Sequence, residues 1–240
     1  MLAPSVSDDG AHSDLALVTR MADRISAAAP LEDVLDDVVV FLTAVVWCDS
    51  CFIYVLEGDE LVLRASKNPH PEAVGRLTLK MGQGITGWVA EHREPVVMAE
   101  GAHQDSRFKL FNELPEDRFE AFVSVPLVSG GRLVGVINVQ DRAPHVYSER
   151  EISIIATLGF LVGAEVERAR LECENAKLSE RLEARKLVER AKGILQGELK
   201  ISEEDAYVML QRQSQQRREA MKDIAEAIVV SHAVRRGAAG

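Results

Sequence analysis

Cationic side chains gather in the last quarter of the 240-residue chain, where they could hold a polyanion. These cations are Arg185, Lys192, Arg212, Arg217, Arg218 and Lys222. Lysine and arginine bind phosphate, and a ring such as that of Tyr207 can stack on an unpaired base, so the combination suits looped RNA. Taken alone, the charge would equally fit a solvated helical face.

The charge is divided unevenly along the chain. Residues 177–240 carry 13 Lys and Arg against 10 Asp and Glu, whereas residues 1–176 carry 15 against 28, and the whole chain has a net charge of −10. The acidic part would repel a nucleic acid, so only the C-terminal residues are expected to hold one. Such a split suggests two modules with different partners.

The composition is that of a globular protein. Hydrophobic residues make up 47% of the chain and charged residues 28%, which excludes a disordered chain. The longest nearly apolar run, Val38–Trp47, has about half the length of a bilayer span. Asp8 and Asp9 stand where a signal peptide would carry Lys or Arg. We therefore expect a soluble, cytoplasmic protein with no membrane partner.

Cys48 and Cys51 form a C-x-x-C motif, a spacing used by redox and zinc sites. An active redox pair begins a helix, whereas residues 51–56 have the β-branched and aromatic composition of a strand. No second cysteine pair or nearby histidine completes a zinc site, so no metal is expected. Both thiols are predicted to be buried or to lie at a strand edge, as free cysteines commonly do.

Residues 82–87, Gly-Gln-Gly-Ile-Thr-Gly, have the G-x-G-x-x-G spacing of a dinucleotide-binding loop. Such a loop needs a long helix after it and a parallel crossover. Here Pro95 ends the helix after about two turns, and the neighbouring strands are predicted to be antiparallel. The glycines are therefore expected to permit a tight turn from strand to helix.

The pattern of apolar residues in the first 145 residues predicts an antiparallel sheet with helices. Apolar positions at helical spacing predict helices in residues 12–28 and 31–42, on either side of Pro30. Strands are predicted at residues 51–56, 61–65, 77–80, 95–99, 122–128 and 133–139. Residues 100–120 are polar and irregular, and a loop of this length is usually functional.

A long helix follows the sheet. Ser148 and Glu151 form a capping box at its start, and no Pro or Gly interrupts it between Gly163 and Gly193. We predict that it continues to about Leu195.

Two shorter helices complete the chain. Residues 197–200 are predicted to form a turn, and a second capping box at residues 202–205 begins a helix that runs to about Ser214. Tyr207 is expected to serve the apolar face of this helix more than to stack on a base. The last helix is predicted to start at about Arg217.

A heptad pattern lies in the middle of the long helix. Leu171, Asn175, Leu178 and Leu182 fall at alternating d and a positions, and a single Asn at an a position specifies a two-stranded pairing. Cys173 falls at an f position and faces away from this seam. The pattern predicts a short coiled coil, and the alternative is that the same residues pack against their own domain.

Residues 12–165 resemble a GAF domain. The resemblance is carried by Gly82-Gln-Gly-Ile-Thr-Gly-Trp-Val-Ala90, Glu94-Pro-Val-Val97, Asp105-Ser-Arg-Phe108, Phe122-Val-Ser-Val-Pro-Leu127, Leu133-Val-Gly-Val-Ile-Asn-Val139 and Tyr147-Ser-Glu-Arg-Glu151. It implies an α+β fold, a central antiparallel sheet with flanking helices, and a small-molecule pocket on the other face of the sheet.

The candidate lining residues of that pocket are Tyr54, Trp88, Met98, Phe108, Phe122, Ser124 and Asn138. Because strand residues alternate between the two faces of a sheet, Tyr54, Phe122 and Ser124 fit the helix-packed core as well as they fit the pocket. Asp141 and Arg142 replace the Asn-Lys pair of cyclic-nucleotide-binding members, so a cyclic nucleotide is not expected. No cofactor is predicted, and the identity of any ligand stays open.

Residues 178–230 resemble an ANTAR domain, the three-helix RNA-binding module of bacterial transcription antiterminators. The match runs through Leu182, Arg185, Val188-Glu-Arg-Ala-Lys-Gly-Ile-Leu195, Ser202-Glu-Glu-Asp-Ala-Tyr207, Leu210, Ser214 and Ile224-Ala225. It implies RNA binding through Arg185, Lys192, Gly193, Tyr207, Gln211, Arg212, Arg217, Arg218 and Lys222. Gly193 is expected to let helices approach closely beside Lys192.

Three positions depart from the ANTAR pattern. Gln211 stands where the family usually has Arg, Gln215 where it often has Met, and Arg218 where Asn is frequent. The departures bear on RNA affinity and loop preference rather than on the fold.

Together the two resemblances predict a homodimeric, sensor-coupled transcription antiterminator that binds paired hairpin loops in nascent mRNA. The expected division is a GAF sensor over residues 12–165, a coiled-coil linker over 166–180 and an ANTAR domain over 178–233. A small molecule or a sensor protein would supply the signal, and no enzymatic motif is present. Two alternatives stay open, a regulator whose C-terminal helices only dimerise and a DNA-binding regulator.

Overall fold

The structure is a computed structural model that describes residues 19, 21–24, 29–67, 71–108 and 118–237. The chain divides into two compact units, residues 1–170 and residues 171–240. Helix α4 (Glu149–Leu199) contributes residues to both of them. The helix expected over residues 12–28 lies mostly outside the described residues.

The first unit is built on a six-stranded antiparallel sheet. Its strands are β1 (Ser50–Glu57), β2 (Glu60–Ser66), β3 (Thr78–Lys80), β4 (Val96–Met98), β5 (Ala121–Ser129) and β6 (Arg132–Asp141). They lie in the order β3-β2-β1-β6-β5-β4. All six predicted strands are present, within one or two residues of their expected bounds, and the α+β fold with a central antiparallel sheet is confirmed.

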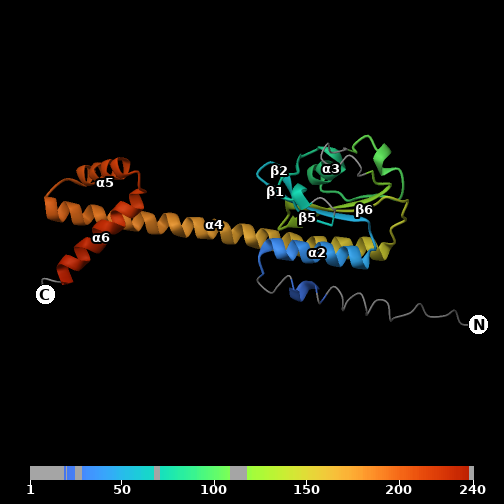
Figure 1. Ribbon diagram of the computed structural model, residues 1–240, viewed down its shortest axis with the longest axis horizontal. Coiled ribbons are helices and arrows are strands. Elements are labelled where there is room, and N and C mark those ends of the chain that lie inside the picture. Colours follow the sequence, from blue (N-terminus) through green and yellow to red (C-terminus); the bar gives the residue numbers. More distant parts are fainter. Residues whose placement is uncertain (1–18, 20, 25–28, 68–70, 109–117, 238–240) are drawn as a thin grey trace, which may run out of the picture. The chain divides into compact units, whose positions relative to one another are not determined.

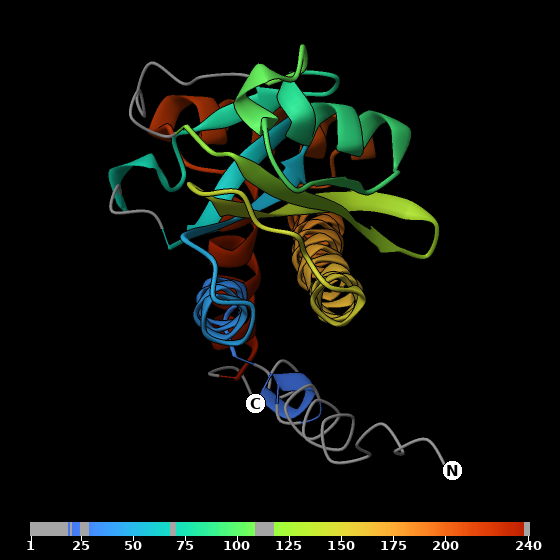
Figure 2. The same cartoon turned by 90° about the vertical axis from the view of Figure 1, so that its right-hand side faces the viewer.

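Helices cover both faces of this sheet. Helix α2 (Leu31–Val45) and the first turns of α4 lie side by side on one face, and α3 (Gly84–His92) lies on the other (Figures 1 and 2). Strand alternation explains the two layers: Ile53 joins the core beneath α2 and α4, whereas its neighbour Tyr54 joins the core beneath α3.

The start of α4 is tied to the end of β6. The backbone N–H of Ser148 donates to Glu151 Oε2 at 2.8 Å and the N–H of Glu151 donates to Ser148 Oγ at 3.3 Å, which confirms the capping box. The Tyr147 hydroxyl donates to the buried Asp141 Oδ2 at 2.8 Å, and the N–H of Asp49 donates to Asp141 Oδ1 at 3.0 Å. Asp141, the last residue of β6, therefore joins the residue before β1 to the residues that lead into α4.

The second unit contains three helices, the end of α4, α5 (Glu203–Arg217) and α6 (Met221–Gly237). The three helices share a small apolar core, to which α4 contributes Ala191 and Leu195, α5 contributes Leu210 and α6 contributes Ala225. No helix among the described residues is long and apolar enough to cross a membrane.

Two predicted boundaries in this unit were wrong. Helix α4 passes through Gly197 and ends at Leu199 rather than at about Leu195, and Lys200, the last residue of the predicted turn, takes the left-handed conformation (φ +59°). Arg217 is the last residue of α5 rather than the start of the next helix. Arg218 then caps α5 with φ +57°, a conformation that Asn and Gly adopt more readily than Arg.

The glycine-rich motif has a structural role in the turn from β3 into α3, as expected. Gly82 has φ +74°, and a Cβ atom on Gly87 would lie 2.5 Å from the carbonyl oxygen of Lys80. The Gly82 N–H also donates to the Gly87 carbonyl at 2.8 Å. The motif therefore packs α3 closely against the end of β3.

We expect Gly87→Ala to destabilise the first unit by about 1–3 kcal/mol, because its methyl group would overlap main-chain atoms that cannot rotate away. Urea unfolding of the full-length protein measures the change. Gly159→Ala is the control: its Cβ would meet only side-chain atoms of Leu127 and Val125 at 3.5 Å. Equal stability of the two variants would contradict the close packing.

Candidate RNA-binding surface and ligand site

Lys192 lies between two carboxylates. Its ammonium group is 2.9 Å from Glu189 Oε2 on the same helix and 2.6 Å from Glu203 Oε1 at the start of α5, and its side chain is only 10% exposed. Hydrogen bonds to Glu189 and Glu203 raise the pKa of Lys192, and the bond from Lys192 lowers the pKa of Glu203. The contacts join α4 to α5, so a contact between Lys192 and RNA would compete with a bond that positions the two helices.

Gly193 is not a site of close helix approach. A Cβ atom built on it meets no atom within 4 Å, and the residue is exposed on α4. The expectation that Gly193 lets helices of this unit approach was therefore wrong. Open space at this position is compatible with a partner outside the chain.

Tyr207 does not belong to the core. It is 44% exposed, whereas Ala206 and Leu210 are the α5 residues that pack fully against the other helices. The expectation that the ring completes the apolar face of α5 was wrong, because two smaller side chains already fill that space. One turn further on, Gln211 is also exposed on the same face of α5.

Four cations of the predicted set carry exposed side chains that make no ion pair with another described residue. These are Arg185 on α4, Arg212 and Arg217 on α5, and Arg218 at its C-terminal cap. Lys222 at the start of α6 differs, because its ammonium group lies 3.8 Å from Glu180 Oε1 on α4. The four arginines are the strongest phosphate-binding candidates, since nothing described neutralises them.

In the first unit, the seven candidate pocket residues come together on the face of the sheet that α3 covers. Tyr54 and Phe122 are buried in this core, and Trp88, Met98 and Phe108 pack against it partly exposed. Trp88 also stacks on His92, with 4.2 Å between ring centroids, and carries the Arg107 guanidinium 4.7 Å from its centroid.

The two polar pocket candidates form a buried chain with a residue that the sequence reasoning missed. Ser124 Oγ donates to Asn138 Oδ1 at 2.7 Å, and Asn138 Nδ2 donates to Thr86 Oγ1 on α3 at 2.7 Å. Thr86 lies within the glycine motif, and the sequence does not indicate which residue its hydroxyl contacts. The chain holds α3 on the sheet through side chains as well as through apolar packing.

Two further polar atoms of this face have no hydrogen-bond partner among the described residues. They are Ser50 Oγ and Gln140 Oε1, which belong to directly paired residues of β1 and β6, both under 5% exposed. An unpaired buried polar atom costs free energy, so such a pair indicates a place for a water molecule or a polar ligand group. No pattern in the sequence marked either residue.

The cysteines do not form a thiolate site. Cys48 and Cys51 are buried, as predicted, and Cys173 is exposed on α4. Burial raises the pKa of the Cys48 thiol to about 12 and raises that of Cys51 as well. A nucleophilic or metal-binding cysteine needs a lowered pKa, and the described residues contain no group of His, Cys, Asp and Glu placed to hold a metal ion.

The predicted seam residues of α4 are uncovered. Leu171, Leu178 and Leu182 are 50%, 63% and 55% exposed, and Asn175 is exposed between them. Within the described residues none of the three leucines joins a hydrophobic core. The alternative that they pack against their own domain is therefore not supported.

Comparison with known proteins agrees with this architecture. Residues 13–167 match the GAF domain and residues 176–229 match the ANTAR domain. The chain belongs to the GAF domain family and carries an ANTAR domain C-terminal to its GAF domain.

Two kinds of relative match this chain. The transcriptional regulatory protein PdtaR of Mycobacterium tuberculosis is 41% identical over 192 residues, which cover 72% of this chain and 93% of that protein. A protein of the phosphoenolpyruvate-dependent phosphotransferase system of Escherichia coli is 28% identical over 162 residues, or 65% of this chain. The alignment spans only about a fifth of that second relative, 21% of its length.

Solved structures match the first unit. The GAF domain of a phosphoenolpyruvate-protein phosphotransferase from Coxiella burnetii aligns with a TM-score of 0.64 and 30% identity, over 70% of this chain and 99% of that one. A free methionine-R-sulfoxide reductase from Neisseria meningitidis aligns with a TM-score of 0.57 over 72% and 98% of the two chains. Its identity of 18% shows a shared fold alone.

Lys192→Met should lower the melting temperature of the second unit, because Glu189 and Glu203 lose their shared cation. The raised pKa of Lys192 stabilises the fold until the pH rises through that pKa, and the lowered pKa of Glu203 stabilises it until the pH falls through its folded value. The difference from wild type should therefore be present at neutral pH and shrink below about pH 4. Thermal unfolding followed by circular dichroism measures it.

Lys186→Met is the matched control, since Lys186 pairs with Glu183 at 2.8 Å but both side chains are about 60% exposed. Its effect on the melting temperature should be close to zero. A Lys192→Met protein as stable as the control would show that the double ion pair does not hold α5 on α4.

Proposed function

We propose that this protein is a signal-responsive transcription antiterminator that binds RNA as a homodimer. Its ANTAR domain binds paired hairpin loops in nascent mRNA, in the cytoplasm, and prevents an overlapping terminator from forming. The match of residues 176–229 to the ANTAR domain carries the proposal. The 41% identity to PdtaR, a transcriptional regulatory protein, supports the same class.

The charges of the second unit support RNA as the partner. Arg185, Arg212, Arg217 and Arg218 have no described counterion, and the exposed ring of Tyr207 is available to stack on an unpaired base. These groups lie on a unit that carries a net positive charge, in a protein that is acidic elsewhere. Such a distribution confines a polyanion to the C-terminal helices.

The proposed signal enters at the α3-covered face of the sheet. The unsatisfied pair Ser50 and Gln140 supports a small polar molecule as the ligand. Asp141 follows Gln140 directly and accepts the hydrogen bond from Tyr147, two residues before α4 begins. A ligand that moves the end of β6 would thereby move the residues that start α4, the helix shared with the RNA-binding unit.

The seam on α4 supports the homodimer. Leu171, Leu178 and Leu182 expose an apolar stripe whose burial against a second copy would be favourable, and Asn175 at an a position would fix two strands in register. The proposed linker over residues 166–180 overlaps this stripe.

Binding to an RNA with two adjacent hairpin loops tests the function. We expect the full-length protein to prefer it over a single-hairpin RNA and over duplex DNA of equal length, with an affinity that falls with salt by a logarithmic slope of about 0.7 for each phosphate contact. Equal binding to duplex DNA would favour a DNA-binding regulator. Absence of RNA binding, with and without small-molecule extracts, would leave the C-terminal helices as a dimerisation element.

The double variant Leu178→Ala/Leu182→Ala should weaken dimerisation at least about tenfold, because two apolar side chains leave the seam. Analytical ultracentrifugation over a concentration series measures the dissociation constant. Val208→Ala removes a comparably exposed apolar side chain from α5 and should leave it unchanged. Identical sedimentation of the double variant and wild type would refute the seam.

A further inference from the structure

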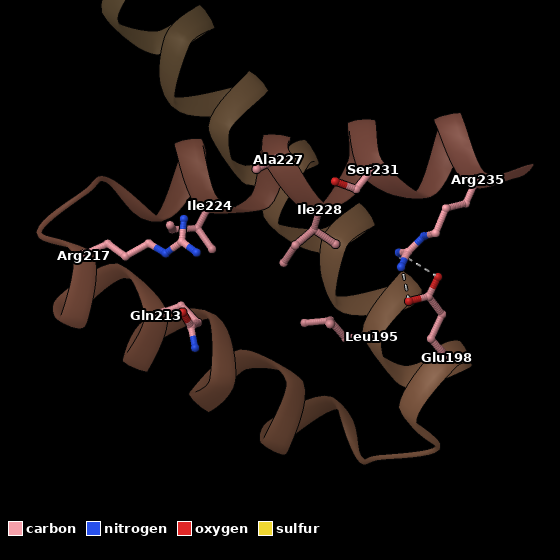
Figure 3. Close-up of a pocket in the computed structure, with 9 residues that line it drawn as sticks. All are labelled: Leu195, Glu198, Gln213, Arg217, Ile224, Ala227, Ile228, Ser231 and Arg235. Carbon is pink, nitrogen blue, oxygen red and sulfur yellow. Dashed lines mark hydrogen bonds and ion pairs between the residues drawn. The ribbon is translucent and has the colours of Figure 1, made fainter. Parts of the chain in front are cut away.

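A pocket of about 350 Å³ opens between the three helices of the second unit (Figure 3). Its apolar floor is made by Leu195 of α4 and by Ile224 and Ile228 of α6, which also belong to or pack against the core of the unit. The volume lies at the lower end of the range for small-ligand pockets, about 300–1,000 Å³. The predicted RNA-binding set contains only one of the lining residues, Arg217.

Polar side chains from all three helices line the rest of the pocket. Gln213 and Arg217 extend from α5, and the Arg217 side chain makes no ion pair or hydrogen bond with any residue that the structure describes. At the other end of the row of α6 side chains stands Arg235, whose Nη2 lies 3.2 and 3.3 Å from the two carboxylate oxygens of Glu198 (Figure 3).

The one carboxylate of the pocket is neutralised. Glu198 accepts a hydrogen bond from His232 Nδ1 at 2.8 Å as well as the contacts from Arg235. The bond from His232 lowers the pKa of Glu198, so the carboxylate stays ionised beside its partners. An anion that approaches from the side of Arg217 therefore meets an uncompensated cation and no free carboxylate.

This combination fits one class of ligand. An apolar floor of limited size, an amide that can both donate and accept, and an unpaired guanidinium match the face, the edge and the phosphate of a single nucleotide. An apolar peptide, or the apolar stripe of a second copy of the chain, would place side chains on the floor but would leave Arg217 without an anion. Charge complementarity thus favours a nucleotide.

We propose that the pocket between Leu195, Ile224, Ile228, Gln213 and Arg217 receives one unpaired base of a hairpin loop, with Arg217 on its phosphate. The inference rests on the proposed RNA-binding function and adds to it a second kind of contact. The exposed ring of Tyr207 and the other arginines hold the loop from outside, whereas this pocket reads a nucleotide that leaves the loop's stack.

Ala227→Trp tests the pocket without removing a charge. Ala227 lines it, so an indole at this position would occupy the space intended for the base. We expect the affinity of the full-length protein for the two-hairpin RNA to fall about tenfold or more, the effect of losing one base-specific contact. Ala233→Trp, an exposed α6 position outside the pocket, should bind as wild type does.

Arg217→Ala provides the second variant, with Arg236→Ala as its control on the exposed end of α6. Only Arg217→Ala should weaken binding and reduce the salt slope, by about 1. Thermal unfolding of all four variants checks that each is folded.

Abasic substitutions in the RNA identify the base. One abasic loop position should weaken wild-type binding as much as Ala227→Trp does, and the two changes together should cost no more than either alone. Full additivity at every position would overturn the pocket, as would wild-type affinity in both Ala227→Trp and Arg217→Ala. In that second outcome the antiterminator function would stand.

Failure of the wild-type protein to bind any hairpin RNA would instead reject the proposed function and the pocket with it. A free nucleotide offers the same chemistry as a loop base, and competition by free nucleoside monophosphates distinguishes the two ligands. A free nucleotide that binds as tightly as the RNA would make this a metabolite site and overturn the loop-base assignment.

Discussion

A single helix has to satisfy two hydrophobic cores, and that constraint shapes the rest of the molecule. Helix α4 places Ile155 and Leu158 against the sheet and, further along, Ala191 and Leu195 against α5 and α6. Between the two cores, the apolar stripe of the helix must either stop or continue over a segment that neither core covers. Here the stripe continues through exposed leucines, which leaves apolar surface that the described part of the chain does not cover.

The two ends of that helix are fixed by polar contacts rather than by apolar packing alone. At its start, Tyr147 and Asp49 both donate to Asp141. Near its end, Lys192 reaches Glu203 at the first turn of α5. Buried or half-buried charges need partners, and in both places the partner belongs to a different element, so each contact sets the position of one element relative to its neighbour.

Most of the fold could be predicted from the sequence, because it depends on local signals. Alternation gave the six strands, and the Ser148 and Ser202 capping boxes gave the starts of α4 and α5. The helix ends were less certain. Gly197 has the residue type that ends helices, yet the left-handed conformation falls on Lys200 and Arg218, where residue type gives no warning.

The candidate sites were predictable as regions but less so residue by residue. Strand alternation brought Tyr54, Phe122 and Asn138 to one face, and composition located the cationic unit. The partners of Lys192 and Thr86 depend on which helix packs against which element, and neither can be read from one segment alone. Tyr207 shows the opposite error, since a large ring was assigned to a core that Ala206 and Leu210 already fill.

The three cysteine thiols differ in their access to solvent, so their rates of alkylation can report how often the first unit opens. Cys48 and Cys51 are buried in the core of the first unit, whereas Cys173 is exposed to solvent on α4. An alkylating reagent would modify Cys173 at once, and the other two only as often as the sheet and its covering helices separate. The rate at which the second and third labels appear therefore measures how often the first unit opens locally, without any engineered probe.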